Sequence, residues 1–104
     1  MSTSRPSPAL VEHHPEHHRF EYADAGHLAM LEYRLTPGRI VFTHTGVPAE
    51  LEGLGVASAL AQAGLEHARR EGLEVLPLCP FVKAYIGRHP EYAPLVGGKL
   101  DSEA

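Results

Sequence analysis

The sequence is poor in the residues on which several classes of protein depend. Cys79 is the one cysteine among 104 residues, so no disulfide can form within the chain. Nine Lys and Arg residues against thirteen Asp and Glu give a formal net charge of -4, which argues against nucleic acid and anionic membranes as partners. Every apolar run is interrupted before it reaches the roughly 20 residues that cross a bilayer, and no secretory signal pattern is present. We therefore expect a cytoplasmic protein.

The chain has the length of one ordinary domain, and its apolar fraction of 43% is enough for one core. Residues 1–18 contain Ser, Pro and His but few large apolar side chains, so we predict a flexible N-terminal tail. Two histidine pairs in this tail are potential ligands of a transition metal, but Pro15 between them disfavours a helix that would bring them to one face. We predict a domain over residues 19–97, a C-terminal tail over residues 98–104, and no metal site.

Three short β-compatible runs follow the N-terminal tail, separated by turn sequences at 24–26 and 36–38: residues 19–23, 28–35 and 39–45. They predict antiparallel strands. In the third run, a strict two-residue period assigns the side chains to two faces, with Ile40, Phe42 and His44 on one face and Val41, Thr43 and Thr45 on the other.

The second half of the sequence predicts a helix, a strand and a second helix. Residues 54–71 have apolar side chains at a helical period, and Gly72 suits the left-handed conformation that often ends a helix. Residues 73–79 are almost wholly apolar, as in a strand buried beside a parallel partner. A second helix is expected over residues 80–88, before Pro90, with an irregular tail after it. The predicted fold is α/β (α+β), with antiparallel strands followed by a βαβ unit and a C-terminal helix.

The junction between the third strand and the first helix, residues 47–58, contains Gly53 and Gly55. Glycine lets a ligand approach the main chain closely, and the first N–H groups of a helix attract phosphate oxygens. This junction is a candidate pyrophosphate cradle, and a tight turn without a ligand is the alternative interpretation. A dinucleotide-binding fingerprint fits less well, because Ser58 stands at the position of its third glycine.

Two longer strings resemble a known family. HTGVPAELEGLGVASAL at residues 44–60 and VLPLCPFVKAYIGRHPEY at residues 75–92 are similar to the two signatures of the short, single-domain GNAT-like N-acetyltransferases, and the resemblance runs from about residue 20 to about residue 95. The phosphate loop of GNAT enzymes reads Gln or Arg, two residues, Gly, one residue, then Gly or Ala. Aligned on Gly53 and Gly55, this chain has Glu50 where Gln or Arg is usual.

The resemblance implies a minimal GNAT-like fold that binds acetyl-CoA as cosubstrate. In such a fold the strand that ends at Val47 and the strand at 73–79 are parallel neighbours that splay apart around the pantetheine arm. Pro77 agrees with a splay, because proline cannot donate a hydrogen bond to a strand ladder. The N–H of Val47 would polarise the thioester carbonyl. The expected cofactor-binding residues are Val47, Glu52, Gly53, Leu54, Gly55, Val56, Ala57, Ser58 and Lys83.

Three side chains are candidate catalytic residues. His44 could deprotonate the acceptor amine, because imidazole titrates near neutral pH, and a packed strand histidine is the alternative. Tyr85 resembles the tyrosine that protonates the departing thiolate in this superfamily, and a packing residue is the alternative. Cys79 precedes the expected second helix, whose N-terminus would stabilise a thiolate that accepts the acetyl group or acts as a base. A small buried apolar residue is the alternative for Cys79, and the superfamily usually transfers acetyl directly.

The acceptor side is the least readable part of the sequence. Compared with a full GNAT domain, the chain lacks the N-terminal helices that normally wall this side. The expected acceptor is a small amine or a lysine of a protein or peptide, and a second subunit in a homodimer is another way to complete the site. We therefore predict an N-acetyltransferase, with a non-catalytic module that binds acetyl-CoA or CoA as the alternative function.

Overall fold

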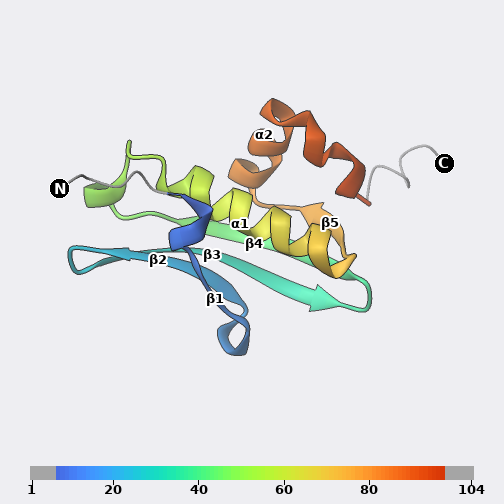
Figure 1. Cartoon of the computed structure of the whole chain (residues 1–104), viewed down its shortest axis with the longest axis horizontal. Helices are drawn as coiled ribbons and strands as arrows, with labels where there is room; N and C mark the ends of the chain where they lie inside the picture. Colours follow the sequence, from blue (N-terminus) through green and yellow to red (C-terminus); the bar gives the residue numbers. More distant parts are fainter. Residues whose placement is uncertain (1–6, 98–104) are drawn as a thin grey trace.

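The computed structural model describes residues 7–97, which form one mixed sheet with helices packed against it (Figure 1). The five strands of this part of the chain lie in chain order, β1-β2-β3-β4-β5. The first four are antiparallel, and β5 runs parallel to β4. Their bounds are Glu12–His14 (β1), Arg19–Asp24 (β2), His27–Thr36 (β3), Arg39–Gly46 (β4) and Glu74–Pro77 (β5). The predicted antiparallel strands and parallel pair are confirmed.

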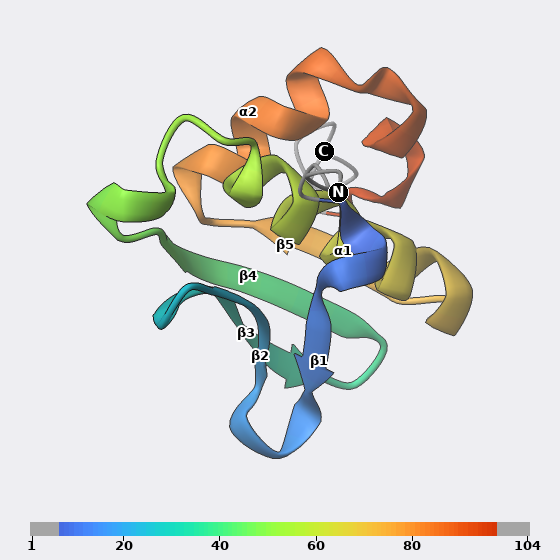
Figure 2. The ribbon, with the colours of Figure 1, turned by 60° about the vertical axis from the view of Figure 1, so that its left-hand side comes forward.

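Two α-helices, α1 (Val56–Glu71) and α2 (Pro80–Arg88), lie on the same side of the sheet, as two views of the ribbon show (Figure 1, Figure 2). Helix α1 is the crossover between β4 and β5, so the predicted βαβ unit is present. It begins at Val56 rather than at residue 54, because Gly55 in the left-handed conformation is its N-cap. Gly72 ends it in the same conformation, with a φ of 70°.

The core lies between the helices and one face of the sheet. Alternate side chains of β2, β3 and β4 are buried there, together with one stripe of α1: Phe20, Tyr22, Ala29, Leu31, Tyr33, Ile40 and Phe42 from the strands, and Val56, Leu60, Ala61, Leu65 and Ala68 from the helix. Burying each large apolar side chain stabilises the fold by roughly 1.5–3 kcal/mol. This packing holds the start of α1 in a fixed position above the end of β4.

A β-bulge interrupts the pairing of β3 with β4. Glu32 lies opposite His44, but the next residue along β3, Tyr33, lies opposite Phe42, so Thr43 is an extra residue in β4. Beyond the bulge, Thr45 lies opposite the buried Leu31 and therefore shares its helix-facing side. The predicted alternation of β4 is thus wrong after Phe42, because the extra residue reverses the faces and puts His44 on the side away from the helices.

The parallel pairing of β4 with β5 ends well before β4 does. The last paired residues are Phe42 and Pro77, and a single further hydrogen bond joins the N–H of Cys79 to the carbonyl oxygen of Phe42 at 2.9 Å. Residues 43–46 of β4 continue without a β5 partner. Pro77 therefore stands at the point where the strand ladder stops, which is where a residue without an N–H donor is tolerated.

The N-terminal segment differs from the flexible tail that the sequence predicts. Residues 12–14 pair with β2 as strand β1, and the His13 ring stacks on Phe20 with ring centroids 4.2 Å apart. His13 Nε2 lies 2.5 Å from the Tyr33 hydroxyl, and the His13 and His67 rings meet edge to face at 4.5 Å. Histidine thus acts here as a half-buried aromatic packing residue, which composition alone does not reveal.

Residues 1–6 and 98–104 of the predicted tails lie outside the described part of the chain, and the domain limits at residues 19 and 97 stay predictions. Between residues 7 and 97, no three potential ligand side chains gather as they would around a metal ion.

The segment after α2 also differs from the expected irregular tail. A 3-10 helix over Pro90–Leu95 packs back on α1, and Tyr92 in it is buried. The Tyr92 hydroxyl donates a hydrogen bond of 2.6 Å to Glu66 Oε2. The guanidinium of Arg69 lies 5.1 Å from the centre of the Tyr92 ring.

Among residues 7–97, no helix is both long and apolar enough to span a membrane.

Candidate functional site

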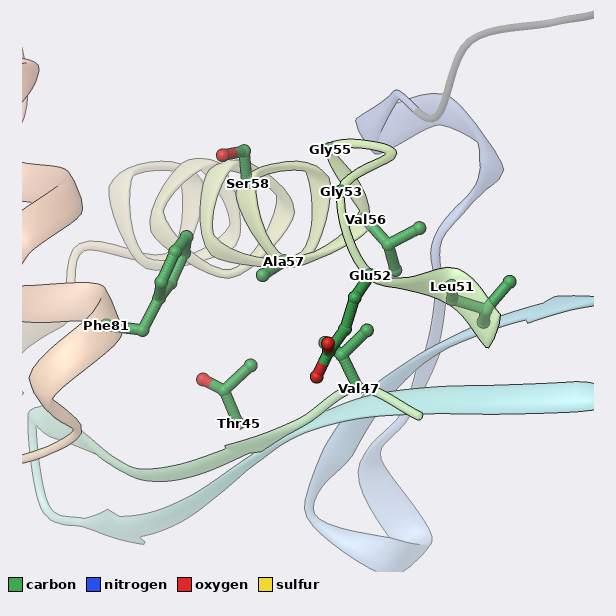
Figure 3. A pocket seen from close by; sticks show the side chains of 10 residues that line it. All are labelled: Thr45, Val47, Leu51, Glu52, Gly53, Gly55, Val56, Ala57, Ser58 and Phe81. Atoms are coloured by element: carbon green, nitrogen blue, oxygen red, sulfur yellow. The ribbon is translucent and has the colours of Figure 1, made fainter. Parts of the chain in front are cut away.

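A cavity of about 490 Å³ lies where β4 ends and α1 begins. Figure 3 shows its walls, formed by the end of β4, the loop that follows, the first turn of α1 and one side chain of α2. The lining residues are Thr45, Val47, Leu51, Glu52, Gly53, Gly55, Val56, Ala57, Ser58 and Phe81. Seven of the nine predicted cofactor-binding residues are among them; the other two, Leu54 and Lys83, are exposed and do not line the cavity.

The start of α1 gives this cavity its hydrogen-bond donors. Gly53 and Gly55 have φ angles of +79° and +91°, which side chains rarely adopt. A Cβ built at either glycine meets no atom within 4 Å, so both face open space. No side chain caps α1, and the first N–H groups of a helix have no partner inside it. The helix dipole adds partial positive charge at the same place, so this end of the cavity favours an anion.

The side-chain charge in the cavity is negative. Glu50 and Glu52 are both exposed, but Glu52 lines the cavity, whereas Glu50 lies outside it, with Oε1 3.6 Å from Nδ1 of His27. The GNAT loop pattern fits the sequence in a second alignment, in which Glu52 takes the Gln or Arg position and Gly55 and Ala57 take the small-residue positions. Because Glu52, Gly55 and Ala57 all line the cavity, the structure favours this alignment over the one that begins at Glu50. No lysine or arginine is among the described lining residues.

Cys79 lies beside the cavity rather than in its lining. Its side chain is 2% exposed, and its Sγ lies 3.0 Å from Thr45 Oγ1, in hydrogen-bond contact. Thr45 itself lines the cavity, so its hydroxyl stands between the thiol and the open space. Cys79 is also the N-cap of α2, as the sequence predicts. The thiol is therefore adjacent to the wall of the cavity and buried behind Thr45.

His44 lies on the other face of the sheet. It pairs with Glu32 across the strands and is exposed, and a Cβ at Gly46 would be 3.4 Å from its Nε2. The imidazole therefore extends along β4 towards the unpaired end of the strand, on the side away from the helices. The structure does not bring His44 together with Cys79, since β4 separates them.

Tyr85 is buried on α2 and does not line the cavity. Its ring stacks on His89 with centroids 4.0 Å apart and lies 6.4 Å from the ring of Phe81, which does line the cavity. Burial, followed by the negative charge of Glu91, raises the pKa of Tyr85 above its usual value. The raised pKa makes the Tyr85 hydroxyl a weaker acid, and it is protonated at neutral pH with or without this shift.

Sequence reasoning missed three lining residues, namely Thr45, Leu51 and Phe81. The two-residue hydrophobic period predicts the wrong face for Thr45, because a β-bulge leaves no sign in that period. Leu51 and Phe81 look like ordinary core residues in the sequence. Phe81 had one usable signal, because it lies in the first turn of α2 next to the strand end that carries Cys79.

The comparison with known proteins agrees with this geometry. The structure is similar to the NMR solution structure of a GCN5-like candidate N-acetyltransferase from Staphylococcus aureus, with 30% sequence identity and a TM-score of 0.67. The match covers 84% of this chain and 86% of the Staphylococcus aureus protein. A sequence model of the GCN5-related N-acetyl-transferase family matches residues 19–95. This chain therefore belongs to the GCN5-related N-acetyl-transferase family.

Proposed function

We propose that this protein transfers an acetyl group from acetyl-CoA to an amine. The observation that carries the proposal is the cavity at the end of β4, in which the unpaired N–H groups of α1 and two left-handed glycines meet the point where β4 and β5 part. Pyrophosphate would bind at the helix end. The pantetheine arm would run past Val47 and Phe81 towards the gap beside β4, with the Val47 N–H available to the thioester carbonyl.

The reaction breaks the C–S bond of the thioester and forms a C–N bond. The neutral amine attacks the carbonyl carbon and loses a proton, and the thiolate of CoA leaves and takes up a proton. His44 is the candidate base for an amine that approaches from the open face of the sheet, where it is exposed. Tyr85 is the candidate acid because it resembles the superfamily's tyrosine that protonates the departing thiolate, although it is buried and does not line the cavity. Lys83, exposed on α2, is a candidate contact for an outer phosphate of CoA.

The proposal also covers the acceptor, the cellular compartment and the role of Cys79. The acceptor is an amine, either a small molecule or a lysine of a protein or peptide, and it or a second subunit would cover the sheet face that carries His44. We place the activity in the cytoplasm. Cys79 would either carry the acetyl group briefly or serve as a packing residue behind Thr45.

The cofactor site is tested by a pair of glycine variants. Gly55→Val places a side chain in the open space of the cradle and is expected to lower CoA affinity on the order of tenfold or more. Gly87→Val is the matched control, because Gly87 is exposed on α2 and a Cβ there meets no atom within 4 Å. Calorimetry gives the affinity and thermal unfolding checks the fold. A folded Gly55→Val protein that binds CoA like the control would remove this loop from the site.

The reaction is tested by incubation with acetyl-CoA and a panel of amines and peptides. Release of CoA that depends on an amine supports the enzyme. Tight CoA binding without release above hydrolysis would favour the non-catalytic module, and absence of CoA binding would leave a structural domain. Mass spectrometry after acetyl-CoA alone, with rates for Cys79→Ala and Cys79→Ser, decides the role of the thiol. Acetylated Cys79 supports the covalent route, whereas a full-rate Cys79→Ala enzyme makes it a packing residue.

A further inference from the structure

We infer that Glu52, in the wall of the cavity, weakens the binding of CoA and acetyl-CoA through charge repulsion with their phosphates. This inference rests on the proposed function. It concerns the position where the GNAT pattern has a neutral or cationic side chain and this chain has a carboxylate. The expected ligand is therefore held by backbone N–H groups against an opposing side-chain charge.

Three features of the cavity support this role. Glu52 lines it, and Figure 3 shows the carboxylate extending from the loop towards Val47 rather than away from the cavity. Among residues 7–97, no hydrogen bond or ion pair holds the Glu52 side chain, whereas Glu50 lies 3.6 Å from His27. The described lining residues include no lysine or arginine that could offset the carboxylate.

The whole chain adds to the effect of Glu52. CoA carries several negative charges on its pyrophosphate and 3′-phosphate, and the protein has a formal net charge of -4. Like charges slow the encounter and weaken the complex at low ionic strength, and salt screens both effects. A cradle built on arginine shows the opposite dependence, since salt weakens an attractive pair. The difference in salt dependence between wild type and a variant at position 52 therefore reports the charge of residue 52.

Charge repulsion from Glu52 should change KM rather than kcat. CoA and acetyl-CoA share their phosphates, so charge repulsion from Glu52 weakens the binding of substrate and product to the same extent. Interactions that are equal in the ground state and the transition state alter KM and leave the chemical step unchanged. Glu52 would therefore set how readily the cofactor enters and leaves, not how fast acetyl is transferred.

The experiment compares wild type, Glu52→Gln and Glu52→Arg, with Glu50→Gln as the control for loss of one carboxylate from the same loop outside the cavity. Calorimetric titration with CoA is done at ionic strengths of about 10 mM and about 150 mM, where the Debye length is about 30 Å and about 8 Å. At low salt, Glu52→Gln is expected to bind CoA about three- to tenfold more tightly than wild type, and Glu52→Arg more tightly still. Glu50→Gln should change affinity by less than about twofold.

The salt series gives a second, independent result. Rising salt should leave unchanged or improve the affinity of wild type, and it should weaken that of Glu52→Arg. Equal affinities for wild type and Glu52→Gln would overturn the inference while leaving the CoA site in place. Selective tightening of wild type by Mg²⁺, lost in Glu52→Gln, would also overturn it, because the carboxylate would then bind a bridging cation. If no variant binds CoA, the proposed function itself fails, and this inference with it.

Discussion

The close packing of α1 against the sheet at Gly64 allows a quantitative prediction of the free energy of unfolding. This glycine is buried in the middle of α1, where a Cβ would lie 2.9 Å from Phe42 Cε1 and 3.0 Å from Leu31 Cδ2. Both neighbours are fully buried, so neither can swing away freely. Gly64→Ala gains up to about 1 kcal/mol from helix propensity. Overpacking a tight core costs about 1–3 kcal/mol, so we expect the free energy of unfolding to fall by up to about 2 kcal/mol.

Gly87→Ala is the matched control, because Gly87 also lies in a helix but is exposed, with no atom within 4 Å of a Cβ. This variant should keep its propensity gain and unfold at the same or a slightly higher urea concentration than wild type. The two variants should therefore differ by about 1–3 kcal/mol in free energy of unfolding. A Gly64→Ala protein at least as stable as Gly87→Ala would show that α1 is not held this closely against β3 and β4.

Two further predictions concern the N-terminal segment, which the sequence predicts to be a flexible tail, and the segment after α2, which it predicts to be irregular. Burial, then the charge of His67, lowers the pKa of His13, so its neutral form is favoured when the segment is docked against Phe20. Docking should be strongest above about pH 6.5 and weaken as pH falls below it, which hydrogen exchange of the β1 amides measures; protection that is unchanged down to about pH 5 would contradict this. Tyr92→Phe removes the 2.6 Å hydrogen bond to Glu66 and should cost about 1 kcal/mol in urea unfolding, and an unchanged midpoint would count against a structural role for this bond.

The sequence was informative wherever the structure depends on neighbouring residues. The helical period gave α1, the apolar run gave β5, and proline and glycine marked most element ends. These signals are local, so they are visible without the fold. The docking of residues 7–18 was not predictable in this way, because His13 finds Phe20, Tyr33 and His67 only after β2, β3 and α1 have come together.

The sequence predicts the part of the site that is formed by residues adjacent in sequence. The glycine loop and the helix start are adjacent in sequence, so the cradle could be placed at residues 53–58 without coordinates. The sequence does not show which of the two glutamates faces the cavity, because Glu50 and Glu52 are close in sequence and both fit the loop pattern. Only the path of the loop, with Glu50 beside His27 and Glu52 in the cavity, separates them.

The bulge at Thr43 also restricts the chemistry that β4 can support. An enzyme that uses a nucleophilic cysteine normally has a base within hydrogen-bond reach of the thiol. In this protein the bulge turns Thr45 towards Cys79, with 3.0 Å between Oγ1 and Sγ, and turns His44 to the opposite face. The one histidine of β4 is therefore not placed to activate the thiol, and a threonine hydroxyl is too weak a base to replace it. His44 is instead exposed on the open side of the unpaired strand end, where an incoming amine would need a proton acceptor. The placement of Thr45 beside Cys79, with His44 on the opposite face, supports direct transfer from thioester to amine over a route through acetylated Cys79.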